Sequence, residues 1–355
     1  MKKITIVYCE GAYNTTNGKT AHGLVRFTER YDVQSIIDSR YKGQDAGMAL
    51  DGKNNGIPIL ASLQEAMKLD ANNPPTHLVV GLAPDGGRLD KQARQDVIAA
   101  IKLGLSVDSG LHDYLSDDPE VIEAAAKSKV HIHDIRKPKA VKDLHFFTGN
   151  IEKVKALKIA VLGTDSAVGK RTTAWRVVFG FRDKGYKAEL IGTGQTAWLQ
   201  GAKYSMVMDS VVNDFVSGEI EHAVYSCWEN EKPDVIVLEG QGSLMNPAYP
   251  GGFELLAAGR PDIVILQHAP ARLEYDGFPG YPLHPIEHQI RAIEVLSGKK
   301  VVAIAVNHED LKPDEIDVAC EKIERETGLP TSDVLVHGPE KLVAALIPFL
   351  KSSIK

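Results

Sequence analysis

The chain has 355 residues, 43% of them hydrophobic and 25% charged, an ordinary balance for a soluble globular protein of roughly two domains. The formal net charge of −6 argues against a general nucleic-acid binder, which usually carries a basic excess to neutralise phosphates. The apolar runs are shorter than the ~20 residues of a membrane span, and the three cysteines lie far apart. We therefore expect a cytoplasmic protein with neither a membrane nor a nucleic-acid partner.

Short apolar runs rich in β-branched residues alternate with helical patterns along the chain, beginning with a strand and not a signal peptide. In the first half we predict strands at 3–8, 33–38, 77–82, 105–110 and 130–135, and helices such as 62–68 and 90–104. In the second half we predict strands at 157–163, 187–193, 234–240, 262–268, 301–307 and 333–338. Continuous apolar runs are typical of parallel strands covered by helices on both faces, which indicates an α/β fold.

The lysine-rich segment 136–156 interrupts this alternation. It contains Pro138 and shows no clear strand. We interpret it as the connection between two α/β units and place the boundary near residue 150. The predicted domains are 1–150 and 151–355.

Polar loops follow several strands of the first half. In open α/β sheets, ligands bind at the carboxyl ends of the strands, so these loops are candidate ligand contacts. A surface loop is an equally good reading of the glycine-containing stretch 11–20, and a lone histidine at a strand end is often structural or exposed. The predicted substrate ligands here are Lys19, Thr20 and Arg88, and the candidate general base is His112.

Other histidines carry less information. His131 and His133 alternate on one predicted strand, but no third metal ligand can be identified for them. We interpret both as ordinary surface residues. The stretch from His284 to His288 does not have the HExxH spacing, so we assign no zinc site there.

The strongest motif is a glycine loop that follows the strand at 157–163 and precedes a helical stretch. That context is what a phosphate-binding P-loop requires, with backbone amides, a helix amino terminus and Lys170 directed at an anion. Two departures from the common pattern are five residues between the glycines and Arg171 in the usual place of Ser or Thr. The alternative is a plain glycine turn before a lysine. The predicted phosphate ligands are Gly163, Thr164, Asp165, Ser166, Ala167, Val168, Gly169, Lys170, Arg171 and Thr172.

The loop GTDSAVGK, together with the strand end VIVLEGQG at 235–242, resembles dethiobiotin synthetase and its relatives. This resemblance implies that Glu239 binds Mg²⁺ directly or through water, and that Asn307 lies where an adenine is read. A hydroxyl of Thr172 or Thr173 and one of two aspartates, Asp209 or Asp214, are available to complete the metal shell. The metal set that we predict is Thr172, Asp209 and Glu239.

A second resemblance covers nearly the whole chain. The chain is similar to a family long catalogued as a domain of unknown function and now called D-glutamate N-acetyltransferase-like. The matching stretches are 19–21, 109–112 with 116–119, 194–196, 214–218, 238–243 and 246–251. Departures are Arg171, Asn246 and Pro250, where Met, His and Ser are expected, and the segment 268–279 matches only in part. The resemblance implies a Rossmann-like amino-terminal domain and a P-loop NTPase-like carboxy-terminal domain.

Three functions follow from these motifs. The first is transfer of acetyl from acetyl-CoA to the amine of a small amino acid such as D-glutamate, with the P-loop holding phosphates. The second is an ATP- and Mg²⁺-dependent ligase or kinase of the dethiobiotin-synthetase type, and the third is a nucleotide-binding module without turnover. We expect a homo-oligomer with Glu239 and His112 as catalytic residues. Further substrate ligands in this prediction are Gln195, Thr196 and Gln241.

Overall fold

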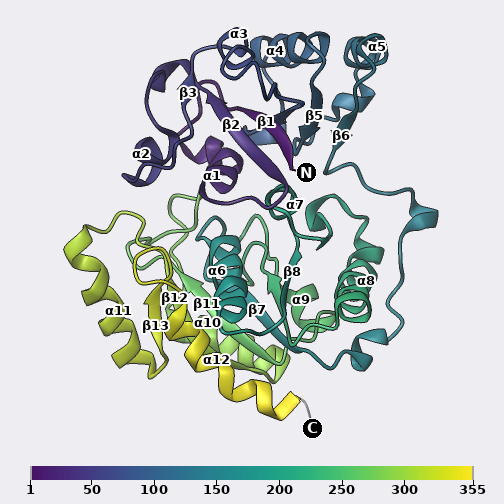
Figure 1. Cartoon of the computed structure of the whole chain (residues 1–355). Helices are drawn as coiled ribbons and strands as arrows, with labels where there is room; N and C mark the ends of the chain where they lie inside the picture. Colours follow the sequence, from purple (N-terminus) through teal and green to yellow (C-terminus); the bar gives the residue numbers. More distant parts are fainter. Residues whose placement is uncertain (1, 354–355) are drawn as a thin grey trace. The chain divides into compact units, whose positions relative to one another are not determined.

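The computed structural model describes residues 2–353 and divides into two compact units (Figure 1). The first unit contains residues 1–138 together with 195–201, and the second contains 139–194 and 202–355. The division at 138–139 falls within the segment 136–156 that the sequence indicates as the connection. The assignment of residues 195–201 to the first unit has no counterpart in the sequence pattern.

The first unit is built on a six-stranded parallel sheet in the order β3-β2-β1-β4-β5-β6. This order reverses direction between β1 and β4, as in Rossmann-type sheets, where ligands bind at the reversal. The strands are β1 (Lys3–Tyr8), β2 (Tyr31–Ile37), β3 (Ile59–Leu60), β4 (His77–Val80), β5 (Ser106–Ser109) and β6 (Ile132–Asp134).

Helices cover both faces of the first sheet because successive side chains of each strand point to opposite sides. Ile6 and Tyr8 pack with α3 (Leu63–Ala66), α4 (Lys91–Lys102) and α5 (Pro119–Ser128). Val7 packs on the other face with α1 (Lys19–Arg26) and α7 (Gln195–Gln200), and Ala46 of α2 (Ala46–Asp51) joins the same cluster. The helix α7 therefore completes a core formed otherwise by residues before 138.

The second unit is built on a seven-stranded parallel sheet in the order β13-β12-β11-β7-β10-β8-β9. The central strand β7 (Leu157–Gly163) is buried along its whole length, which explains its continuous apolar sequence. The other strands are β8 (Ala188–Gly192), β9 (Tyr204–Ser205), β10 (Val235–Glu239), β11 (Ile263–His268), β12 (Lys300–Val306) and β13 (Thr331–Asp333).

Two layers of helices enclose the second sheet (Figure 1). One layer contains α8 (Asn213–Glu231), α9 (Phe253–Ala257) and α10 (Ile286–Ser297), whose apolar side chains form one cluster with those of the strands. The other layer contains α6 (Lys170–Asp183) and α12 (Glu340–Ser353), and α11 (Pro313–Thr327) lies beside β13. The predicted α/β class, with a Rossmann-like unit followed by a P-loop unit, is confirmed.

Some predicted elements differ from the structure. The strand predicted at 333–338 is wrong, because β13 ends at Asp333 and the carboxylate of Asp333 accepts the amides of Leu335 and Val336 in a turn. The strands β3 and β9 were missed because each has only two residues, too few for a periodic pattern.

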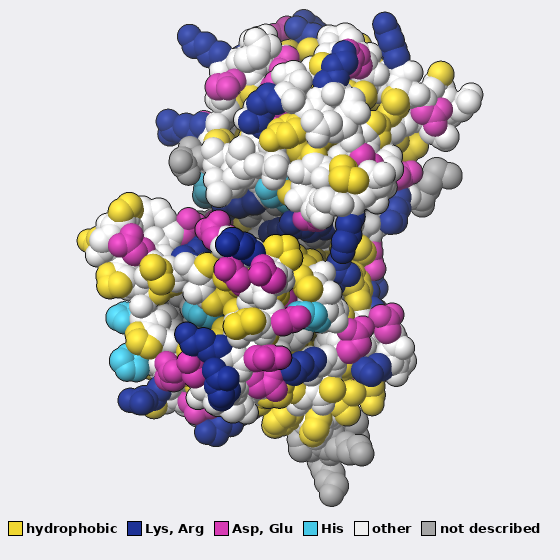
Figure 2. Space-filling model, turned by 90° about the vertical axis from the view of Figure 1, so that its left-hand side faces the viewer, with side chains coloured by type: hydrophobic (Ala, Val, Ile, Leu, Met, Phe, Trp, Pro, Cys, Tyr) yellow, Lys and Arg dark blue, Asp and Glu magenta, His cyan; other side chains and the backbone are white. Residues whose placement is uncertain are grey.

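No helix within residues 2–353 is long and apolar enough to cross a membrane. On the face shown in Figure 2, acidic and basic side chains are interspersed over the second unit. This mixture agrees with the small net charge of the chain.

Candidate functional site

The P-loop follows β7 and leads into α6, and its lysine is the centre of the candidate site. Lys170 is only 7% exposed, and its Nζ donates to the carbonyl oxygens of Asp165 at 2.6 Å and Gly242 at 2.7 Å. Burial lowers the pKa of Lys170 to about 8, although the nearby carboxylates of Asp165 and Glu239 oppose this shift. The ammonium is thus held by backbone carbonyls at the carboxyl edge of the sheet, with its charge poorly solvated.

The backbone of this loop is turned by residues with positive φ. Gly169 has φ of 100°, which favours glycine, and Ala167 has φ of 55°, which is strained for a residue with a side chain. Close approach also restricts Gly240, where a β carbon would lie 2.3 Å from the carbonyl oxygen of Val161 and 3.0 Å from Cδ of Lys170. The loop is therefore preformed around Lys170.

A buried carboxylate ties the P-loop to two neighbouring loops of the second unit. Asp165 is fully buried and accepts from Arg272 Nη1, Asn246 Nδ2 and the Asp276 amide, each at 2.8 Å. Arg272 also donates to the Ser166 carbonyl at 2.8 Å and to the Glu309 carboxylate at 2.5 Å. Sequence reasoning did not select Arg272, because the segment around it matches the family pattern only in part.

Glu239 lies at the end of β10, next to the loop that follows β8. Its Oε2 accepts the Thr193 amide at 2.8 Å, and its backbone carbonyl accepts the Thr193 hydroxyl at 2.9 Å. Gln241 joins this group, since its Nε2 donates to the same hydroxyl at 2.9 Å. Burial raises the pKa of Glu239, which makes it a better proton acceptor than an exposed glutamate once it is ionised.

Asn307 lies close to the end of the P-loop, at the carboxyl end of β12. Its Nδ2 is 3.7 Å from the position that a β carbon at Gly169 would take, and its backbone amide donates to the His268 carbonyl at 2.8 Å. The His268 ring is within 3.0 Å of the Thr164 hydroxyl, and burial lowers the pKa of His268 to about 4. The structure therefore brings Asn307, predicted as an adenine contact, to the phosphate loop.

The predicted metal ligands are arranged differently from one another. Glu239 is buried and bonded to Thr193, whereas Asp209 lies in a short 3-10 turn (Met208–Ser210) and is exposed. Thr172 lies in the first turn of α6, one residue beyond Arg171. Within residues 2–353, no group of three or more His, Cys, Asp or Glu side chains is arranged to hold a metal ion. The set of Thr172, Asp209 and Glu239 stays a prediction.

The candidate substrate residues of the first unit gather at the carboxyl ends of β1, β4 and β5. The loops after β1 and β4 are joined, since the Ala83 amide donates to the Asn17 carbonyl at 2.7 Å. The His112 amide bonds the Gly87 carbonyl at 3.0 Å, and the exposed Arg88 pairs with Asp113 at 3.4 Å. His112 and Lys19 are also exposed.

The amino-terminal end of α7 contributes to the same edge of the first sheet. The Thr196 hydroxyl is 3.4 Å from that of Thr20, and both residues are buried. The Gln195 side chain packs against Gly110, where a β carbon would lie 2.6 Å from its Cγ. Four predicted substrate residues, Lys19, Thr20, Gln195 and Thr196, are thus neighbours within the first unit, while Gln241 belongs to the second.

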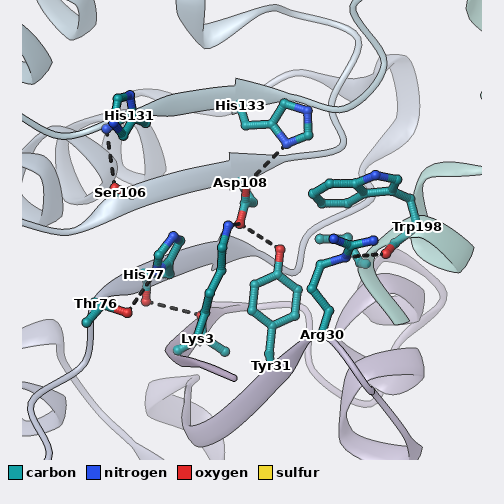
Figure 3. A network of polar contacts seen from close by, with 12 residues as sticks. Lys3, Arg30, Tyr31, Thr76, His77, Ser106, Asp108, His131, His133 and Trp198 are labelled. Carbon is teal, nitrogen blue, oxygen red and sulfur yellow. Dashed lines mark hydrogen bonds and ion pairs between the residues drawn. The ribbon is translucent and has the colours of Figure 1, made fainter. Parts of the chain in front are cut away.

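A polar network around the buried carboxylate of Asp108 in the first unit was not predicted from the sequence (Figure 3). Asp108 of β5 accepts the Tyr31 hydroxyl at 2.6 Å, and its carboxylate lies 3.3 Å from the His133 ring and 3.7 Å from the Lys3 ammonium. Trp198 of α7 packs against His133 and is covered by the Arg30 guanidinium at 3.7 Å. His133 is therefore part of the contact that holds α7 on the sheet.

A cavity of about 600 Å³ lies at the other edge of the second sheet, before β7, β11 and β12. Its lining includes Lys158, Arg260, Asp262 and Lys299, and none of the predicted site residues. Since ligands in open parallel sheets bind at the carboxyl ends of the strands, the P-loop edge remains the candidate site.

Family models match both units. A Rossmann-like domain of the DUF1611 type, described as a domain of unknown function, matches residues 39–138. The P-loop domain of the same type, also described as a domain of unknown function, matches residues 145–343, more than half of the chain. The chain belongs to the DUF1611 family.

Two relatives of this chain have an assigned name. A D-glutamate N-acetyltransferase of Tritonibacter scottomollicae is 30% identical over 302 residues, covering 83% of this chain and 86% of its own. A D-glutamate N-acetyltransferase of a Pseudoalteromonas species is 31% identical over 292 residues, covering 80% of this chain and 84% of its own. The predicted resemblance to this family is confirmed.

The fold of the DUF1611 protein is also found in a solved structure. A DUF1611 family protein from Anabaena variabilis, solved by crystallography, superposes with a TM-score of 0.90 at 26% identity. The match covers 98% of this chain and all of the other. This chain therefore shares its fold with another DUF1611 family protein.

Proposed function

We propose that this DUF1611 protein is an N-acetyltransferase that moves acetyl from acetyl-CoA to the amine of a small amino acid such as D-glutamate. The observation that carries the proposal is the similarity to two relatives named D-glutamate N-acetyltransferase, at 30% and 31% identity over at least 80% of the chain. The geometry of the P-loop supports it, because the donor carries a phosphorylated ADP group. Such a group needs a phosphate-binding loop, but none of its phosphates is cleaved.

The P-loop contributes binding and not chemistry in this proposal. The amino terminus of α6 and the ammonium of Lys170 attract the diphosphate of CoA, and Lys170 exchanges its two carbonyl partners for phosphate oxygens. Asn307, whose Nδ2 lies near Gly169, is the candidate contact of the adenine. The remaining loop residues, from Gly163 to Thr172, offer backbone amides and hydroxyls.

The transfer step requires a free amine. The amine nitrogen attacks the thioester carbonyl carbon, a C–N bond forms, and the C–S bond breaks to release the CoA thiolate. A general base first removes a proton from the substrate ammonium, and the thiolate takes up a proton after it leaves. Glu239 and His112 are the candidate bases. Lys19, Thr20, Arg88, Gln195, Thr196 and Gln241 are the candidate ligands of the amino acid.

A second function has one observation in its favour. A buried acidic residue, Glu239, ends β10 near the P-loop lysine, as in ATP- and Mg²⁺-dependent ligases of the dethiobiotin-synthetase type. In that function the loop binds ATP, and a carboxylate of the substrate is phosphorylated. The two functions differ in their products, free thiol or ADP.

The test is a pair of product assays on the full chain. The protein is incubated with acetyl-CoA and a panel of D- and L-amino acids, and free thiol is measured; ADP is measured in parallel with ATP, Mg²⁺ and the same panel. We expect thiol release with D-glutamate or a close analogue and no ADP above background. ADP release without thiol release would overturn the transferase in favour of the ligase.

Lys170→Met tests the role of the loop. Removing a charge-assisted phosphate contact is expected to weaken CoA binding by roughly 10- to 100-fold, with the fold intact because the Met stem fills the same space. Lys184→Met, an exposed lysine at the end of α6, is the matched control and should bind CoA normally. Equal CoA affinity in both variants, measured by calorimetry, would contradict a phosphate role for Lys170.

A further inference from the structure

The residue after the P-loop lysine is the feature that departs most from nucleotide-binding loops. In the common pattern that position supplies a Ser or Thr hydroxyl to Mg²⁺. Here it is Arg171, in the first turn of α6. A guanidinium has only N–H donors and a fixed positive charge, so it repels a metal ion where the pattern provides a ligand.

Neighbouring hydroxyls do not replace the missing ligand. Successive residues of a helix point about 100° apart, so Thr172 does not occupy the helix position of Arg171, where the pattern has its hydroxyl. The Thr173 side chain is buried and donates to the amide oxygen of Gln267 in β11. The α6 end of the loop therefore offers no hydroxyl in the place that a P-loop metal requires.

The acidic residue of the site is already hydrogen-bonded to the backbone of the second unit. Glu239 is 3% exposed, and one of its carboxylate oxygens accepts the Thr193 amide at 2.8 Å. The Arg171 Nε atom is itself buried, so its charge acts in a poorly screened environment.

We propose that the guanidinium of Arg171 takes the place of the divalent cation, so that this P-loop binds phosphates without a metal. In the complex, the guanidinium of Arg171 donates hydrogen bonds to phosphate oxygens from the helix position that normally supplies the metal-binding hydroxyl. This proposal rests on the proposed function, in which the loop binds the phosphates of CoA and does not cleave them. Phosphoryl transfer needs a metal to bridge the phosphates, whereas acetyl transfer from CoA does not.

The experiment measures binding and not turnover. CoA and ADP are titrated by calorimetry into the full chain, once with EDTA and once with excess Mg²⁺. We expect equal affinity within about twofold in the two conditions, since a fixed cation already fills the role of the metal. Tighter binding of either ligand with Mg²⁺ than with EDTA would overturn the proposal.

Substitution of Arg171 sharpens the test. Arg171→Ser is expected to weaken CoA binding in EDTA by roughly 10- to 100-fold, the value of one charge-assisted contact, and Mg²⁺ should restore part of this loss. Arg171→Lys keeps the charge and should remain independent of Mg²⁺ with an intermediate affinity. Arg176→Ser, at an exposed position of the same helix, is the control and should bind as the native chain does.

The outcomes separate this proposal from the proposed function. Metal-independent binding of CoA or ADP that is lost in Arg171→Ser supports the role of Arg171 even where no amino acid is acetylated. Acetyl transfer that depends on added Mg²⁺ supports the transferase and overturns the role of Arg171. Unchanged CoA affinity in a folded Arg171→Ser protein, checked by thermal melting, also overturns it.

Discussion

The carboxyl edges of the two parallel sheets are built in contrasting ways. In the second unit the charged groups at this edge, Asp165, Lys170 and Glu239, are buried and bonded to backbone atoms. In the first unit the side chains of Lys19, Arg88 and His112 are exposed at the corresponding edge. The fold itself therefore fixes the buried groups of the second unit. The exposed groups of the first unit are not fixed by burial, so a ligand would have to order them.

Buried charge also occurs in the first unit, within β5 at Asp108 and directly after β2 at Asp38. Asp108 is held by Tyr31 and His133, and Asp38 accepts the Tyr13 amide at 2.8 Å and pairs with Arg40 at 2.7 Å. These carboxylates bind elements of the same unit to each other. Removing one partner of a buried pair is expected to cost stability in either unit, but only in the second should it also cost ligand affinity.

The largest effect on stability is expected at Asp165. Asp165→Asn leaves the Arg272 guanidinium without its buried carboxylate, which should lower the free energy of unfolding by about 3 kcal/mol, as for other broken buried pairs. It should also weaken CoA binding, because the amides of the P-loop lose their fixed arrangement. Chemical denaturation and calorimetry measure the two effects.

Asp183→Asn is the control for this substitution. Asp183 is exposed at the end of α6, so its change is expected to stay within about 0.5 kcal/mol. A stable Asp165→Asn protein with native CoA affinity would show that the edge of the second sheet is not held by Asp165.

A smaller effect concerns the protons exchanged on binding. Because the pKa of Lys170 is lowered to about 8 and a bound phosphate raises it again, CoA binding at pH 8 should take up about half a proton. At pH 6 Lys170 is already protonated, so uptake should be close to zero. Calorimetry in two buffers with different heats of ionisation measures this number, and Lys170→Met should abolish it.

Lys170 also lowers the stability of the fold by an amount that depends on pH. Its folded pKa of about 8 lies below the ordinary value of 10.5, so the charged form is disfavoured by folding. The resulting destabilisation is complete below pH 8 and disappears as the pH rises towards 10.5. In the two-buffer calorimetry described above, a heat of CoA binding that is independent of the buffer at pH 8 would contradict the lowered pKa of Lys170.

The smallest effect on stability is expected at Arg88. Its pair with Asp113 is solvent-exposed on both sides, so Arg88→Gln should change the free energy of unfolding by less than about 0.5 kcal/mol. In the proposed function Arg88 binds a carboxylate of the amino acid. The substitution should therefore raise the KM for the amino acid roughly tenfold and leave the CoA affinity unchanged. A loss of CoA affinity in this variant would contradict the assignment of Arg88 to the amino acid and not to CoA.

Much of the fold was predictable because long buried strands leave continuous apolar runs. The strand at 157–163 was predicted with its observed bounds, since every residue of β7 is buried. Short strands such as β3 and β9 leave no period in the sequence, and the run after Asp333 forms a turn through a side-chain bond that apolar character does not reveal. The assignment of residues 195–201 to the first unit was also not predicted, because nothing in the local sequence marks them as part of that unit.

The candidate site was predictable where its residues form a local motif or, as for Glu239 and Asn307, where they match the resemblance to dethiobiotin synthetase. The loop from Gly163 to Lys170 is a local motif, and its geometry follows from glycine spacing and the adjoining strand and helix. Arg272 and Asp276 come more than a hundred residues later and reach Asp165 through the topology of the sheet. Their types and spacing carry no motif, so only the three-dimensional structure identifies them.

Because residues 195–201 belong to the first unit, the protein cannot be divided into two complete units by a single cut of the chain. A fragment ending at residue 138 would lack Leu199, which is fully buried, and the carbonyl partners that Leu199 and Gln200 offer to Thr28 and Glu29. A fragment starting at residue 139 would instead carry an orphan apolar helix. Single-cut truncations should therefore aggregate, and a soluble amino-terminal half requires the α7 peptide to be grafted back onto it.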